Sequence, residues 1–182
     1  MTSTWQINPA GKGRFLPDDL SLYIGKKTLG KLVLEAMEEA NARKAEREGR
    51  ESRSVAFESA MMLTLLTYCY ATGVYGSMDI QLGMQRDQMI RYLCAGDYPD
   101  ICVIRSVRRY HRETITRCLA AVLQCVWELR FCGEDAEPTC GVPYIEALLT
   151  RWFDANSTPD FKREAEERVL QAARADSMAA DL

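Results

Sequence analysis

The sequence has few of the residues and patterns on which enzymes and metal sites depend. His111 is the single histidine among 182 residues, and none of the seven cysteines stands in a Cys-x-x-Cys pair. A phosphate-binding glycine loop, a dinucleotide fingerprint and a nucleophile motif are all missing. We therefore expect no catalytic residues, no metal, no cofactor and no enzymatic activity.

Two structural patterns are missing as well. No apolar run approaches the ~20 residues of a membrane span, so we expect no membrane contact. No stretch alternates apolar and polar residues between turn residues, as a half-buried strand would. The cysteine count is odd and no secretory signal is visible, which argues against a disulfide framework and for a cytoplasmic protein. We predict an all-α fold.

The apolar periodicity and the turn residues place the helices. We predict helices over 28–48, 54–72, 86–94, 100–131, 142–154 and 159–178, and a short one capped by Ser77. Residues 1–14 are expected to form a flexible lead, 15–131 the main domain, and 132–182 a helical extension packed on the same core. The fold should be a compact multi-helix domain with a helix-turn-helix-like core, and its one long central helix should be 100–131.

The first half of the predicted 100–131 helix is two-sided. Residues 101–117 carry five Lys/Arg against one Asp/Glu, although the whole chain has a net charge of −3. Arg105, Arg108, Arg109 and Arg112 recur at i, i+3, i+4 and i+7 and so share one helix face. Such a face is either a solvated side of a core helix or the cationic side of a helix that reads DNA.

Three short motifs frame this cationic face. Tyr70-Ala71-Thr72-Gly73 ends an apolar helix, Arg91-Tyr92-Leu93 precedes the turn at Pro99-Asp100, and Arg108-Arg109-Tyr110-His111 follows. Together they resemble the N-terminal domain of DDE-type bacterial insertion-sequence transposases, over residues 15–125 and most specifically over 68–112. The chain departs from that family at Gly76-Ser77-Met78, where Ser-Ser-Arg is usual, at Ile101-Cys102-Val103, where a polar pair before Thr is usual, and at Val107, where Phe is usual.

The resemblance implies a DNA-binding module, a truncated or repurposed transposase N-terminus. Its partner would be duplex DNA, bound by Arg105, Arg108, Arg109 and Arg112 with Ser77 and Gln81 nearby. Complete enzymes of the family hold metal ions on a separate ribonuclease-H-like domain, and no β-rich segment of this sequence would supply one.

A second hypothesis belongs to another class. The chain would be a helical protein-interaction or oligomerisation module that kept the scaffold and lost DNA reading. Residues 118–182 carry twelve Asp/Glu against six Lys/Arg. The apolar C-terminal helices and the acidic tail could bind a protein partner or a second copy. DNA affinity that falls with salt would separate the two hypotheses.

Overall fold

The most apolar stretch of the chain forms the centre of the core. In the computed structural model, which describes residues 16–48, 53–131 and 160–180, this stretch is helix α3 (Arg53–Ala71). Every residue from Met61 to Ala71 is buried. A helix that is apolar around its whole circumference needs cover on all sides, and the other helices supply that cover.

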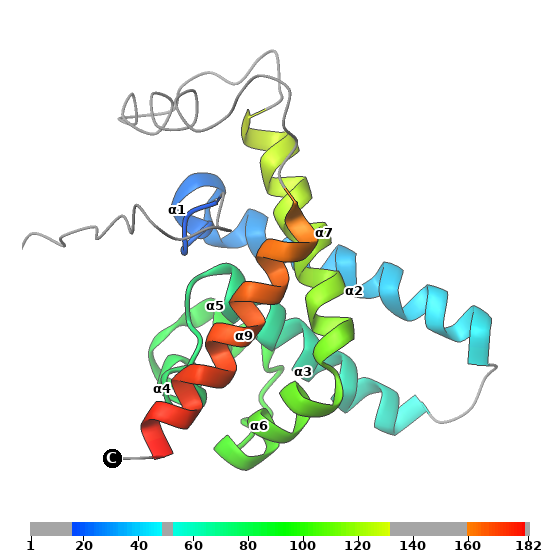
Figure 1. Cartoon of the computed structure of the whole chain (residues 1–182). Helices are drawn as coiled ribbons and strands as arrows, with labels where there is room; N and C mark the ends of the chain where they lie inside the picture. Colours follow the sequence, from blue (N-terminus) through cyan, green and yellow to red (C-terminus); the bar gives the residue numbers. More distant parts are fainter. Residues whose placement is uncertain (1–15, 49–52, 132–159, 181–182) are drawn as a thin grey trace, which may run out of the picture.

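The remaining elements are also helices, which confirms the all-α prediction (Figure 1). No strand occurs within the described ranges. The elements are α1 (Ser21–Ile24), α2 (Lys26–Glu48), α4 (Ser77–Arg86), α5 (Gln88–Leu93), α6 (Ile101–Tyr110), α7 (Arg112–Phe131) and α9 (Phe161–Ala180). The predicted lead 1–14, the predicted helix 142–154 and the loop between Cys132 and Cys140 lie outside the described residues.

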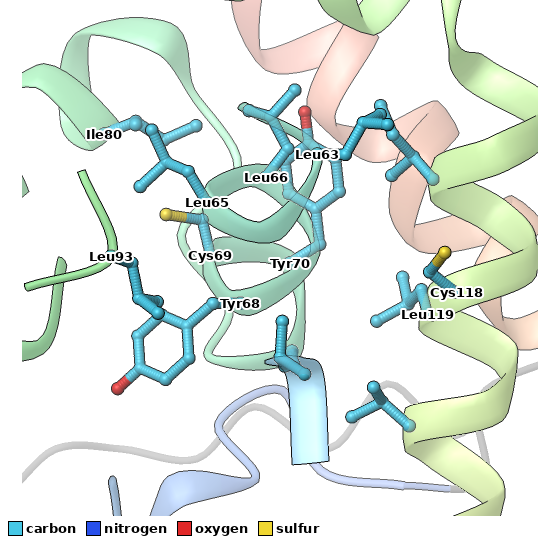
Figure 2. Packing of buried hydrophobic residues seen from close by; sticks show 14 of the residues in the cluster. Leu63, Leu65, Leu66, Tyr68, Cys69, Tyr70, Ile80, Leu93, Cys118 and Leu119 are labelled. Carbon is cyan, nitrogen blue, oxygen red and sulfur yellow. The ribbon is translucent and has the colours of Figure 1, made fainter. Parts of the chain in front are cut away.

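Helix α3 is packed between two groups of helices. Figure 2 shows Ile80 of α4 and Leu93 of α5 on one side of α3, with Cys118 and Leu119 of α7 on the other. Helix α7 in turn packs against α2 and α9. The predicted core position Ile104 on α6 is fully buried. The core therefore joins every helix from α2 to α9 in the described part of the chain.

The prediction of one continuous helix over 100–131 is wrong at one position. His111 has φ −113° and ψ 22°, which ends α6, and Arg112 begins α7. The backbone bonds continue across the break, since the His111 N–H donates to Val107 O at 2.9 Å and the His111 carbonyl accepts from Ile115 N at 3.0 Å. No Gly or Pro marks this position. The break is explained by tertiary packing, because α6 packs on α4 while α7 packs on α2 and α9.

The side chains that cap α5 and α6 are carboxylates and not hydroxyls. The Asp100 side chain accepts from Val103 N at 2.8 Å, as predicted for α6. Asp87 accepts from Met89 N at 2.8 Å and so begins α5, a cap that the sequence analysis did not identify. The predicted Ser77 cap is wrong: α4 begins after Gly76, and no side chain caps it. The Ser77 hydroxyl is directed to another helix instead.

Gly73 allows the chain to reverse direction tightly after α3. Its φ is +76°, and a Cβ at this position would lie 3.2 Å from the Cβ of Asp18. The close approach brings the segment before α1 against the end of α3, where Leu20 N donates to Ala71 O at 3.0 Å. Tyr75 Oη donates to Asp18 Oδ1 at 3.2 Å across the same turn. A residue with a side chain at position 73 would be strained, and Asp18 would have to move by a few tenths of an ångström to admit its Cβ.

A buried arginine of α9 closes this junction. The Arg168 side chain is fully buried and pairs with Glu164 one turn earlier at 3.0 Å. Its guanidinium also donates to four backbone carbonyl oxygens, those of Leu16 (3.3 Å), Pro17 (2.6 Å), Asp18 (3.0 Å) and Tyr70 (3.0 Å). Glu164 accepts in return from Leu16 N at 3.2 Å. We call these six residues the Arg168 centre; it joins α9, the segment before α1 and the end of α3.

Candidate nucleic-acid interface

The region predicted to form the helix-turn-helix-like core consists of α5, a seven-residue connection and α6. The connection 94–100 reverses the chain through Ala95 and Gly96, which both have positive φ, at 52° and 86°. Pro99 is buried, and Asp100 caps α6 directly after it. The predicted turn before α6 is therefore present, and its residues act as structural determinants of the chain reversal.

Arg108 is directed into the protein and not toward solvent. Its side chain is 6% exposed, so the prediction that four arginines share one exposed face is wrong for this member. The guanidinium donates to Tyr70 Oη, to Tyr75 O at 3.0 Å, to Ala172 O at 2.8 Å and to the Asp176 carboxylate. A buried charge needs such a complete set of acceptors, because an unpaired one is costly.

Tyr70 connects the two buried arginines. Its carbonyl oxygen accepts from Arg168 and its hydroxyl accepts from Arg108. The Arg108 guanidinium carbon also lies 5.6 Å from the centre of the Tyr70 ring. Burial raises the pKa of the Tyr70 hydroxyl, although the Arg108 charge acts in the opposite direction. Tyr70 thus connects α3 to both α6 and α9.

Asp176 of α9 gathers two other predicted site residues. Its carboxylate accepts from Ser77 N at 2.8 Å and from Ser77 Oγ, and Ser77 is fully buried. Arg105 Nε lies 3.4 Å from the same carboxylate, and the Arg105 side chain is 37% exposed. Ser77 and Arg108 are therefore enclosed and Arg105 is held at the edge, so these three do not form an open surface.

The pKa of Asp176 is lowered by this environment. Burial by itself would raise the pKa of the carboxyl. The two hydrogen bonds from Ser77 and the charges of Arg108 and Arg105 outweigh burial, because each of them favours the ionised form. Asp176 is thus a carboxylate under ordinary conditions, and it offsets one of the two arginine charges beside it.

The remaining predicted residues are open to solvent or partly so. Arg109 near the end of α6 and Arg112 at the start of α7 are exposed, and neither has an ion pair with another described residue. Between them Tyr110 is 77% exposed and His111 is half-buried. Gln81 on α4 is half-buried. The exposed cations of the predicted set are thus confined to the α6–α7 junction.

Sequence reasoning missed Asp176 and the Arg168 centre. A signal was present, because Glu164 and Arg168 fall on the apolar stripe formed by Phe161, Ala165, Val169 and Ala172. Two opposite charges one turn apart within an apolar stripe indicate a buried pair. The partners of that pair are far away in sequence, and no local pattern could have identified them.

The described part of the chain has few groups that could bind a metal ion or act as a reactive thiol. There, no cluster of three or more His, Cys, Asp or Glu side chains could hold a metal ion. The cysteines Cys69, Cys94 and Cys118 are buried, and burial raises the pKa of the Cys94 thiol to about 11. Among the helices described, none combines the length and apolarity needed to cross a membrane.

Comparison with protein-family models, with curated proteins and with solved structures finds no match to this chain.

Proposed function

We propose that this protein binds duplex DNA through the α6–α7 junction, with Arg109 and Arg112 as the residues that contact phosphate. The observation that carries the proposal is the pair of exposed arginines, without acidic partners among the described residues, on either side of the break at His111. Phosphate contacts supply most of the non-specific affinity of DNA-binding proteins.

The resemblance to transposase N-terminal domains gives this proposal only indirect support, because several of the residues that carry the resemblance have structural roles. Gly73 and Tyr70 maintain the fold in this chain, Asp100 caps a helix, and Arg108 is buried. The shared motifs are therefore consistent with a shared scaffold, and DNA recognition depends on other side chains. Of the predicted site, the proposal keeps Arg109 and Arg112 as direct contacts, whereas Ser77 and Arg108 support the fold.

Salt-dependent binding tests the proposal. Fluorescence anisotropy with a labelled random duplex, at several salt concentrations, should show affinity that falls with salt. Arg109→Ala combined with Arg112→Ala should weaken binding and reduce the slope of log K against log salt by about two, since each phosphate contact contributes about one. Binding by the double variant equal to that of the parent would refute the assignment.

Lys162→Ala provides the matched control for loss of an exposed cation. Lys162 follows Phe161, whose ring lies 6.4 Å from that of Trp127. Trp127 is fifteen positions after Arg112 on α7, or roughly 22 Å along the helix. Removing Lys162 should leave the affinity and the salt slope unchanged if binding is local to the α6–α7 junction.

A second candidate function is self-association. Met78 and Leu82 stand one turn apart on α4 and are 58% and 41% exposed, although both are large and apolar. An apolar pair on one helix face would fit a second copy of this chain. Sedimentation equilibrium should then give a dimer that Met78→Ser with Leu82→Ser converts to a monomer; a monomeric parent at all concentrations would exclude this candidate.

A further inference from the structure

The Asp176 carboxylate occupies a position that is built for an anion. It lies at the N-terminus of the ten-residue helix α4, where it accepts from the Ser77 N–H at 2.8 Å and from the Ser77 hydroxyl. Arg108 donates to the same carboxylate, and Arg105 Nε lies 3.4 Å from it. A backbone N–H at a helix start, a hydroxyl and two guanidinium groups are the donors that bind phosphate in proteins.

Two arginines share one carboxylate at this position. Arg105 and Arg108 both pair with Asp176, whereas Asp79 in the first turn of α4 lies beside Gly76 and has no ion pair with another described residue. Arg108 cannot leave, because it also donates to Tyr75 O and Ala172 O and is 6% exposed. Arg105 has no such additional acceptors among the described residues apart from Ser77 Oγ at 3.4 Å, and its side chain is 37% exposed. Arg105 is therefore the member of the pair that can turn toward an external anion.

We propose that Asp176 is an internal substitute for a DNA phosphate, which holds Arg105 and the start of α4 away from DNA until the end of α9 is displaced. This inference rests on the proposed DNA binding and adds its regulation. Arg109 and Arg112 make the first contacts. In the parent chain Asp176 still holds Arg105 at this stage; only when the Asp176 carboxylate is displaced or removed does Arg105, with the Ser77 N–H and hydroxyl, bind a further phosphate of the same duplex.

The way in which α9 is held allows such a release. Its first half is fixed by the Arg168 centre and by the buried residues Ala165, Val169 and Ala172. Beyond Ala172 the residues Ala173, Arg174 and Ser177 are exposed, and this end of α9 is held by the Asp176 side chain itself, which is 11% exposed and pairs with Arg108 and Ser77. Unwinding the helix after Ala172 removes Asp176 from Arg105 and leaves the Arg168 centre in place. The end of a helix is also the part that opens at the lowest free energy.

The first test removes the charge of Asp176 in the full chain. Asp176→Asn should bind the random duplex more tightly than the parent, with a salt slope larger by about one, because one more phosphate contact forms. Glu166→Gln, the same charge change at an exposed site of α9, controls for the general loss of negative charge. An equal gain in the two variants, or no gain in Asp176→Asn, overturns the inference.

Arg105 supplies the second test, which does not depend on the folding of Asp176→Asn. In the otherwise unchanged chain, Arg105→Ala should leave affinity and salt slope as they are, because Asp176 already holds this side chain back. In the Asp176→Asn background the same change should abolish the gain. A loss on Arg105→Ala in the parent as large as that on Arg109→Ala would show that Arg105 is already available, and would refute the proposal.

Inorganic phosphate separates failure of the inference from failure of the proposed function. At phosphate ten times its Kd and constant ionic strength, the melting temperature of Asp176→Asn should rise by about 3–6 °C relative to chloride. The parent and Glu166→Gln should not respond. If neither the parent nor Asp176→Asn binds DNA but phosphate stabilises Asp176→Asn, the anion site stands and the DNA function fails. If phosphate does not stabilise Asp176→Asn, the position of the Asp176 carboxylate is not an anion site and the inference is refuted.

Discussion

Arg108 of α6 and Asp176 of α9 form an ion pair across 68 residues of sequence, with side chains that are 6% and 11% exposed. The pair connects α6 to α9. Removing one partner of such a pair leaves an uncompensated charge in a place with little water. The position of α9 therefore depends on residues that the sequence pattern assigned to DNA.

The Arg168 centre should be among the most sensitive places in the fold. Arg168→Met removes the arginine partner of the fully buried Glu164 carboxylate and the Arg168 donor of four carbonyl oxygens. We expect a loss of about 3–5 kcal/mol in the free energy of unfolding, measured with urea. Arg174→Ala, an exposed arginine of the same helix, should change it by at most about 0.5 kcal/mol. Equal, small effects would contradict the role given to the centre.

Two glycines with similar backbone angles should respond differently to alanine. Gly73 and Gly25 have φ of +76° and +81°, but a Cβ would meet Asp18 at 3.2 Å at position 73 and nothing within 4 Å at position 25. Gly25→Ala should cost about 1–2 kcal/mol from strain alone. Gly73→Ala should cost more, since the neighbouring chain must also move. Thermal melts that rank the two variants in the opposite order would refute this explanation.

Large-to-small changes should confirm the position of the core. Leu65 and Ile104 are fully buried, so replacing either by alanine should cost about 2–5 kcal/mol. Leu22 is 65% exposed, and Leu22→Ala should have little effect on the same urea transition. If Ile104→Ala melts like the parent, α6 does not pack as described.

Acid should weaken the attachment of α9. The folded-state pKa of Asp176 is lowered, so its contribution to stability is present above the unfolded pKa of about 3.9 and disappears as the pH falls through the lower folded value. The difference in unfolding free energy between the parent and Asp176→Asn should be constant above about pH 5 and shrink below about pH 4. A difference that does not change between pH 3 and pH 7 would contradict the pairing.

The helices could be predicted because their signals are local. The apolar run 54–72 and the Pro99-Asp100 turn specify α3 and the start of α6 without reference to the rest of the chain. The break at His111 could not be predicted, since its residues are compatible with a continuous helix and the packing of α6 and α7 on different neighbours decides the outcome.

The candidate site shows the same limit. Helical spacing placed Arg105, Arg108, Arg109 and Arg112 on one side, and this was sufficient to find the exposed Arg109 and Arg112. Which arginine is enclosed depends on Asp176, which belongs to another helix and is distant in the sequence. Periodicity describes one helix at a time, so it cannot distinguish a cationic face that meets water from one that meets a carboxylate.

The Arg168 centre also determines when the fold can be completed during synthesis. Leu16 N donates to Glu164 across 148 residues, and Arg168 Nη1 donates to Asp18 O across 150. A ribosome adds roughly 5–20 residues per second, so the segment before α1 waits on the order of ten seconds for its partners. Until α9 emerges, the carbonyl oxygens of 16–18 and of Tyr70 lack the Arg168 donor that they have in the folded chain, so a helix near the end of the described residues completes the packing of their first segment.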